Sequence, residues 1–314
     1  MGESSQKIGK KLEGFGNTLF ANLGWEMLGQ NLEIVCTHSN HKSVGAKSGM
    51  KRTHGIDILQ SFYNPFLRRK EAVIIECKNH QWKDFIPSKI QQWLEELLNT
   101  MECASTSHKV APYLTNATLT TGILLFNSSD NLYDYAKAVD TLNNIEPLRR
   151  RMPAMLYLAD TVRLEKWHAV NNEIMQIKKQ NKDDNDFAII YPSISGSQWD
   201  RLDIITPSYL FSDYILASYT KIDKNEDIQV KVEVKVVFFF DTISEDSMLY
   251  MVNMINALQL EACTGRKKEV HIYFYPEKEN DKDIIEDYFN KNVLKSKPNY
   301  KIRFLNNRRL SFID

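Results

Sequence analysis

The pattern of hydrophobic and polar residues predicts a helix, three strands, a helix and a strand within the first ~130 residues. Apolar residues recur three and four positions apart where a helix is expected, and form short runs where a strand is expected. Pro87 opens the second helix, a position that proline favours. The expected elements are a helix over 8–23, a strand or hairpin over 25–36, strands over 55–60 and 71–78, a helix from Pro87, and a strand over 121–126.

Helices and strands continue to alternate through the rest of the chain. Residues 178–186 (KKQNKDDND) are polar and charged, which favours a linker. We therefore expect two domains, 1–180 and 187–314, of which the second is a separate α/β unit. The further expected elements are helices near 130–143 and over 161–178, 245–262 and 282–294, and strands over 155–158, 230–240, 269–275 and 300–305.

Composition narrows the classes of protein that fit this pattern. The chain has 314 residues, of which 43% are hydrophobic, so it can bury a sizeable core. Lys and Arg together number 40, as do Asp and Glu, so a uniformly basic nucleic-acid surface is excluded and any such surface must be local. The four cysteines form no C-x-x-C pair. With neither an apolar leader nor an apolar run of membrane-spanning length, we expect a cytoplasmic protein that does not enter membranes.

Two charged residues lie at the end of the apolar run that begins at Val73. Glu76 and Lys78 are two positions apart, so in a strand they project from the same face, while Cys77 projects towards the core. Unpaired buried charge is costly, which favours a chemical use for this pair. Asp57 lies nineteen residues upstream, in the expected neighbouring strand. Two carboxylates on adjacent strands can hold a divalent cation for phosphodiester chemistry.

These residues resemble the motif of the PD-(D/E)xK nuclease superfamily, which includes restriction endonucleases and Holliday-junction resolvases. Gly55-Ile56-Asp57-Ile58 matches the first motif strand, with Ile56 in place of proline, and Ile75-Glu76-Cys77-Lys78 matches the second. The family also carries a glutamate on its first helix, followed by a glycine-aromatic pair. Leu12-Glu13 and Gly24-Trp25 fit this feature, and their spacing is most similar to the Mrr-like branch.

The resemblance implies a restriction-endonuclease-like α/β core and Mg²⁺- or Mn²⁺-dependent hydrolysis of DNA. It implies that Asp57, Glu76 and Glu13 bind the metal and that Lys78 orients the attacking water. A polar residue on the helix after the motif often assists in this family, and Gln91 is the preferred candidate here because it lies at the edge of the apolar stripe. By analogy, a nuclease with an extra domain belongs to a bacterial restriction or anti-phage defence module.

Each of these features also has a simpler interpretation. Glu76 and Lys78 can form an ion pair at a sheet edge, where such pairs contribute little. Asp57 can be a strand-end turn residue, Glu13 a solvated helix residue and Gln91 a helix-surface residue. The alternative function is a catalytically silent or partner-gated DNA-binding or scaffold subunit with a nuclease fold. The second unit is then expected to serve oligomerisation, as in a homodimer, or to bind a partner protein or sense a substrate.

The polar loop before Asp57 offers two further sets of residues. Lys47, Lys51 and Arg52 are candidates for phosphate contacts, with a solvated loop as the alternative. The same loop is flanked by three histidines and one cysteine: His38, His41, His54 and Cys36. A zinc site needs a closed set of four ligands at suitable spacing, and Cys36 is the only nearby fourth candidate, so the sequence disfavours zinc.

Overall fold

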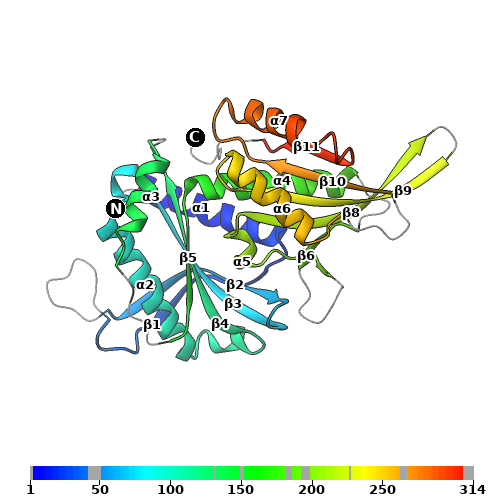
Figure 1. Ribbon diagram of the computed structural model, residues 1–314. Helices are drawn as coiled ribbons and strands as arrows, with labels where there is room; N and C mark the ends of the chain where they lie inside the picture. The colour runs from blue at the N-terminus through cyan, green and yellow to red at the C-terminus, as the bar shows by residue number, and fades with distance from the viewer. Residues whose placement is uncertain are drawn as a thin grey trace. The chain divides into compact units, whose positions relative to one another are not determined.

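The computed structural model shows two mixed α/β units (Figure 1). It describes residues 3–41, 51–130, 132–146, 148, 152–180, 186–191, 199–225, 228–261 and 267–306. The described helices are α1 (Glu3–Asn22), α2 (Pro87–Thr106), α3 (Tyr135–Asn143), α4 (Thr161–Gln180), α5 (Pro207–Leu210), α6 (Glu245–Ala257) and α7 (Asp281–Asn292). Among the described residues, no helix combines the length and apolar character needed to cross a membrane.

The strands form two separate sheets. The first sheet contains β1 (Glu26–Val35), β2 (Thr53–Asn64), β3 (Arg69–His80), β4 (Thr118–Ser128) and β5 (Met155–Ala159), in that spatial order. The second has the order β11 (Tyr300–Phe304), β10 (Lys267–Phe274), β9 (Ile228–Phe239), β8 (Tyr214–Asn225), β6 (Ala188–Tyr191) and β7 (Asp200–Leu202).

In the first sheet, β3 is the central strand. It pairs antiparallel with β2 and parallel with β4, so it has a neighbour on both sides. Helix α2 packs on one face with Ile74 and Leu124 in a shared apolar core. On α1, a Cβ built on Gly16 would come within 3.4 Å of Ile58 and Leu125, which places α1 on the other face. The central strand is therefore shielded from water by a helix on each side.

The close approach of α2 to the sheet depends on a glycine. A Cβ at Gly122 of β4 would lie 2.7 Å from the sulfur of Met101 and 2.8 Å from Leu156 Cδ2. Real Cβ atoms do not come this close, so a larger residue here must shift the side chains of Met101 and Leu156 or the elements that carry them. The core under α2 is thus packed to contact distance at the strand beside the motif.

The second unit covers residues 165–309 and has its own core. Its two long strands, β8 and β9, pair antiparallel, whereas β9, β10 and β11 run parallel. Helices α6 and α7 bury Met251 and Phe289 with Val237, Ile272 and Phe274 of the sheet. Ser244 caps α6 by accepting a hydrogen bond from the backbone N–H of Ser247, as expected for an N-terminal capping residue. The alternation of helices and strands predicted for this region is confirmed.

The first compact unit ends at Leu164, inside α4. The domain limits expected from the sequence, 1–180 and 187–314, stay a prediction, because residues 181–185 of the expected linker lie outside the described residues. The sequence pattern did not predict β6, β7, α5 or β8. Three of these are short, and in the second half of β8, residues 220–225, only Ile222 is apolar, so this half lacks the alternation that marks a strand.

Candidate active site

Asp57 and Glu76 lie where β2 and β3 begin to diverge. The paired register of the two strands runs as far as Ile58 opposite Ile75. Asp57 is the residue before Ile58 and Glu76 the residue after Ile75, so both carboxylates project from the same end of the ladder. Asp57 Oδ2 accepts a hydrogen bond from the backbone N–H of Cys77 at 2.8 Å. The side chain of one motif strand is therefore held by the backbone of the other.

Lys78 and Glu76 face the same side of β3, as the two-residue spacing predicted. Lys78 Nζ lies 2.6 Å from Glu76 Oε1, and the side chains are only 17% and 15% exposed. An ion pair on an exposed sheet edge would be solvated, but this pair lies on the central strand of five. Two largely desolvated charges on a central strand are costly unless they have further partners or a function.

Glu13 brings a third carboxylate to this region from α1. Its side chain is partly buried, and burial together with the charge of Glu76 raises the pKa of Glu13, against the opposing effect of Lys10. Burial also raises the pKa of Asp57, as does the nearby Glu13, although the Cys77 N–H and Lys78 act in the opposite direction. The helix and the two strands therefore place their carboxylates within electrostatic reach of one another.

The charge balance of the site favours a bound cation. Burial raises the pKa of Glu76, Lys78 opposes this effect, and Asp57 and Glu96 add to it. Burial alone would lower the pKa of Lys78, but the surrounding carboxylates outweigh burial and raise it. Lys78 thus stays protonated and cannot neutralise several carboxylates alone. Mg²⁺ and Mn²⁺ prefer carboxylate oxygens, so these residues fit a divalent cation of that class.

Helix α2 contributes a residue that the sequence interpretation missed. Glu96 is close enough to raise the pKa of both Glu76 and Lys78. Gln92, one turn earlier, donates a hydrogen bond from Nε2 to Glu96 Oε1 at 3.4 Å. The i, i+4 spacing of Gln92 and Glu96 on one flank of the apolar stripe was visible in the sequence, but nothing marked this flank as the one facing the motif.

Gln91, the residue selected from the sequence, has a different neighbour. Its Nε2 donates to Glu95 Oε1 at 3.0 Å, on an exposed part of α2. Its Oε1 is buried and accepts no hydrogen bond within the described part of the chain. The supporting role of Gln91 stays a prediction. On the flank of α2 that carries Gln92 and Glu96, it is Glu96 whose charge raises the pKa of Glu76 and Lys78.

Cys77 lies inside the motif without the properties of a nucleophile. Its side chain is partly buried. Burial is the main reason that the pKa of its thiol is raised well above the ordinary range, and the negative charges of Asp57 and Glu76 add to this effect. A thiol held in its neutral form is a poor nucleophile and a poor metal ligand. This agrees with its expected role as a packing residue.

The basic residues expected to contact phosphate are only partly described. Lys47 lies outside the described residues. The backbone N–H of Lys51 donates a hydrogen bond to His41 O at 2.8 Å. Burial is the main cause of the lowered pKa of His54, and the charge of Lys51 is the second. The carbonyl of Arg52 accepts from the backbone N–H of Cys36 at 2.8 Å. Their role in binding nucleic acid stays a prediction.

A five-stranded mixed sheet covered by a helix on each face, with carboxylates and a lysine on its two motif strands, is the architecture of a PD-(D/E)XK nuclease. Residues 1–163 match the family described as the GAPS4 protein PD-(D/E)XK nuclease domain, and the chain belongs to that family, which is associated with anti-phage defence. No curated protein gives a significant match to the chain. The fold class and the family resemblance expected from the sequence are both confirmed.

Proposed function

We propose that this protein is a metal-dependent endonuclease that hydrolyses DNA phosphodiester bonds in anti-phage defence. The observation that carries the proposal is the convergence of Asp57, Glu76 and Lys78 on the two central motif strands, with Glu13 in electrostatic reach from α1. Membership of a nuclease domain family supports the type of chemistry.

Each of the four residues has a distinct role in this proposal. Asp57, Glu76 and Glu13 hold Mg²⁺ or Mn²⁺, which when bound neutralises charge on the scissile phosphate and lowers the pKa of the attacking water. The Cys77 N–H holds Asp57 in place, so its second carboxylate oxygen remains free to bind. Lys78 keeps its proton, orients the water and stabilises the negative charge that develops on the phosphate.

The surroundings of the site support a role for further residues. Lys51 and Arg52 precede Asp57 in the chain, and we assign them, with Lys47, to contacts with the DNA backbone. The charge of Glu96 adds to that of Glu76 in raising the pKa of Lys78, which favours the protonated lysine. The second unit is assigned to self-association or to binding a partner protein, and the site of action to the cytoplasm.

The proposal is tested by incubating the protein with circular DNA, linear DNA and single-stranded RNA, each with Mg²⁺, Mn²⁺ or a chelator. Wild type is compared with Asp57→Ala, and with Glu95→Gln as a matched control, because Glu95 is an exposed carboxylate on α2. We expect wild type and Glu95→Gln to cleave DNA only with the cation, and Asp57→Ala to be inactive. Preferred cleavage of RNA would overturn the DNA assignment.

The alternative of a silent or partner-gated subunit predicts a different result. All three proteins would then be inactive, while wild type still bound DNA. Activity that appears only when a partner protein is added would support gating. Equal cleavage by wild type and Asp57→Ala would contradict both the nuclease site and its residue assignments.

A further inference from the structure

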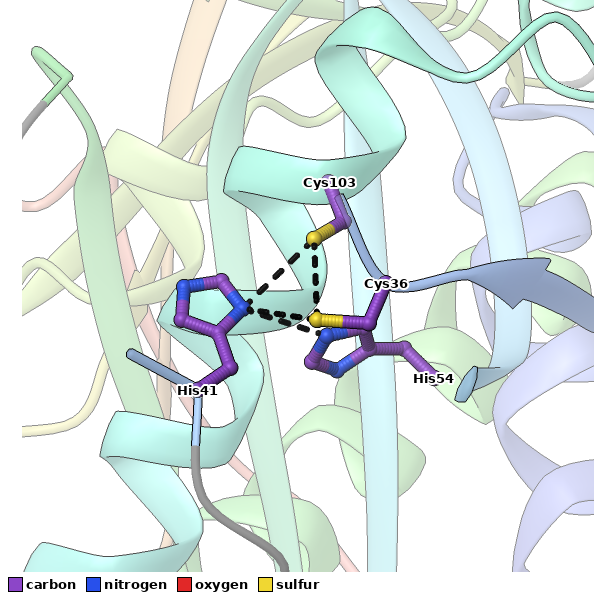
Figure 2. Close-up of side chains that lie close together, drawn as sticks. All are labelled: Cys36, His41, His54 and Cys103. Atoms are coloured by element: carbon purple, nitrogen blue, oxygen red, sulfur yellow. Dashed lines mark hydrogen bonds between the residues drawn. The ribbon is translucent and has the colours of Figure 1, made fainter. Parts of the chain in front are cut away.

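A second group of metal-ligating side chains lies in the first unit, formed by Cys36, His41, His54 and Cys103 (Figure 2). Cys36 follows β1, His41 lies in the loop after it, His54 is at the start of β2, and Cys103 is near the end of α2. One ligand atom from each residue lies within 4.8 Å of the other three. Three of the side chains are buried and Cys36 is partly buried. Four segments of the chain thus converge on one point.

Four of the six ligand-to-ligand distances in this group are close to those of a tetrahedral zinc site, and the other two, from His54 Nε2 to the sulfurs, are within 4.8 Å. With Zn–S bonds of about 2.3 Å and Zn–N bonds of about 2.05 Å, tetrahedral angles give separations of about 3.8 Å for S···S, about 3.6 Å for S···N and about 3.3 Å for N···N. The two sulfurs, of Cys36 and Cys103, are 3.8 Å apart. His41 Nδ1 lies 3.4 Å from Cys36 Sγ and 3.5 Å from Cys103 Sγ. His41 Nδ1 and His54 Nε2 are 3.2 Å apart.

The outer nitrogens of both histidines have the partners that zinc-bound histidines require. A ligating histidine usually donates its other ring N–H to a carboxylate or another acceptor, which orients the ring and selects the tautomer. His41 Nε2 lies 3.2 Å from Glu102 Oε2. His54 Nδ1 lies 3.4 Å from Thr100 Oγ1, whose own hydrogen is donated to Glu96 O at 2.8 Å. The lone pairs of the two rings are therefore on the nitrogens that face each other, His41 Nδ1 and His54 Nε2, and His41 Nδ1 also faces both sulfurs.

We propose that Cys36, His41, His54 and Cys103 bind a structural Zn²⁺ ion. Four protein ligands close the coordination sphere, which is the mark of a structural rather than a catalytic zinc site. Both cysteines bind as thiolates, so two protons pass to the solvent when Zn²⁺ enters. Soft sulfur and imidazole ligands also separate this site from the carboxylate site at Asp57 and Glu76, which suits Mg²⁺ or Mn²⁺.

His38 is the one nearby residue that competes for a place in the ligand set. Its ring stacks on that of His41 at a centroid distance of 4.8 Å, and its Nδ1 lies 3.5 Å from Cys103 Sγ. His38 also forms a second possible group with His41 and Glu102. That group would need His41 Nε2 as its ligand atom, leaving Nδ1 between the two sulfurs without an ion. The set with two sulfurs includes both cysteines, and His38 Nδ1 has a separate neighbour in Thr37 Oγ1 at 3.2 Å, so we place His38 outside the set.

The zinc site would support the strand that carries the nuclease motif. His54 precedes Asp57 by three residues in β2, about 10 Å along the strand. Cys103 follows Glu96 by seven residues in α2, also about 10 Å along the axis. The ion would therefore tie the start of β2 to α2, the helix that covers the motif, and hold Asp57 in register with β3.

The test measures zinc in untagged protein that is purified without chelator and dialysed against excess Mg²⁺. We expect about one zinc per chain in wild type and in Asp57→Asn, and less than about one-tenth of that in Cys103→Ser and His54→Gln. His38→Gln should keep its zinc, as should Cys77→Ser, the matched cysteine control in the same unit. Loss of zinc in Asp57→Asn alone would place the ion at the carboxylate site and overturn the proposal.

A spectroscopic test uses wild-type protein alone, so its result does not depend on whether the variants fold. Replacing the metal of wild type with Co²⁺ should give the thiolate-to-cobalt charge-transfer band and the intense visible bands of a tetrahedral S₂N₂ site. Chelation should lower the melting temperature, and Zn²⁺ but not Mg²⁺ should restore it. A wild-type protein that contains no zinc, takes up none and gives no such cobalt spectrum would show a hydrogen-bonded cluster or a Cys36–Cys103 disulfide instead.

Discussion

The carboxylate of Asp57 is held by the backbone N–H of Cys77, the residue between the glutamate and the lysine of the motif, at 2.8 Å. This bond continues the connection between β2 and β3 past the last register pair, Ile58 and Ile75. It uses one oxygen of the carboxylate and leaves the other for a ligand. A single hydrogen bond therefore joins the first motif strand, β2, to the second, β3, at the candidate site.

Replacing Asp57 should separate its structural and chemical contributions. Asp57→Asn keeps an acceptor for the Cys77 N–H and removes a carboxylate whose pKa is raised by burial, so we expect metal-free stability equal to or above that of wild type. Asp57→Ala leaves a buried N–H without its acceptor, and we expect it to be about 1–3 kcal/mol less stable than Asp57→Asn. Chemical denaturation measures both. Equal stability of the two variants would show that the hydrogen bond contributes nothing.

Glu13 should show opposite effects on stability and function. Because burial and Glu76 raise its pKa, its ionised form destabilises the metal-free fold. Glu13→Gln should therefore melt at the same temperature as wild type or higher without divalent cation, and gain less from added Mn²⁺. Differential scanning fluorimetry with and without Mn²⁺ tests this. A Mn²⁺-induced shift equal to that of wild type would remove Glu13 from the metal site.

The raised pKa values of Glu13, Asp57 and Glu76 give a pH dependence with a definite sign. The folded state binds protons at these groups more tightly than the unfolded chain, so lowering the pH towards the raised pKa values stabilises the metal-free fold through them. The same protons compete with the cation. Calorimetry should therefore show weaker Mn²⁺ binding at about pH 5 than at about pH 7.5. Binding that is independent of pH over this range would contradict the carboxylate ligand set.

Glu96 offers a test of the flank of α2 that faces the motif. Its charge raises the pKa of Lys78 and opposes ionisation of Glu76. We expect Glu96→Gln to slow cleavage by about 10-fold, less than the roughly 10²–10³-fold lost when a group that contacts the transition state is removed, because Glu96 acts through Lys78 and Glu76. Glu95→Gln, an exposed neighbour on the same helix, should leave the rate unchanged. Equal rates for the two variants would show that Glu96 does not act on the site.

The packing of α2 on the sheet is tested at Gly122. A Cβ there would meet Met101 and Leu156 at under 3.0 Å, so Gly122→Ala should destabilise the fold by about 1–3 kcal/mol. Gly14 of α1 has nothing within 4 Å of a built Cβ, so Gly14→Ala should be neutral or stabilising by up to about 1 kcal/mol. Urea denaturation of both variants gives the comparison. A Gly122→Ala protein as stable as wild type would show that the side chains of Met101 and Leu156 can shift at little cost.

The sequence was sufficient to predict those helices and strands whose own pattern of apolar residues identifies them. The apolar stripe of α2 and the apolar runs of β3 and β4 predicted their elements, because period and length distinguish helix from strand. The same-face placement of Glu76 and Lys78 followed from strand geometry alone.

Features that depend on tertiary proximity could not be predicted in the same way. Glu96 reaches the motif only because α2 crosses that face of the sheet. Cys103 lies 67 residues from Cys36 and has no spacing relation to the histidines, so the sequence analysis considered only Cys36 beside the three histidines and disfavoured zinc. Both residues come from a helix whose sequence reads only as an amphipathic core helix. Only the contacts of that helix in the folded protein show that Glu96 lies near the motif and Cys103 near Cys36.

The central claim is most directly tested by single-turnover cleavage of a supercoiled plasmid with Mg²⁺, comparing wild type, Lys78→Ala and Glu95→Gln. Lys78 is the group that stays protonated beside the carboxylates, so its loss should slow cleavage at least about 10²-fold, whereas Glu95→Gln should match wild type and chelator should abolish cleavage by all three. Cleavage by Lys78→Ala at the wild-type rate, or cleavage that persists in chelator, would contradict the account.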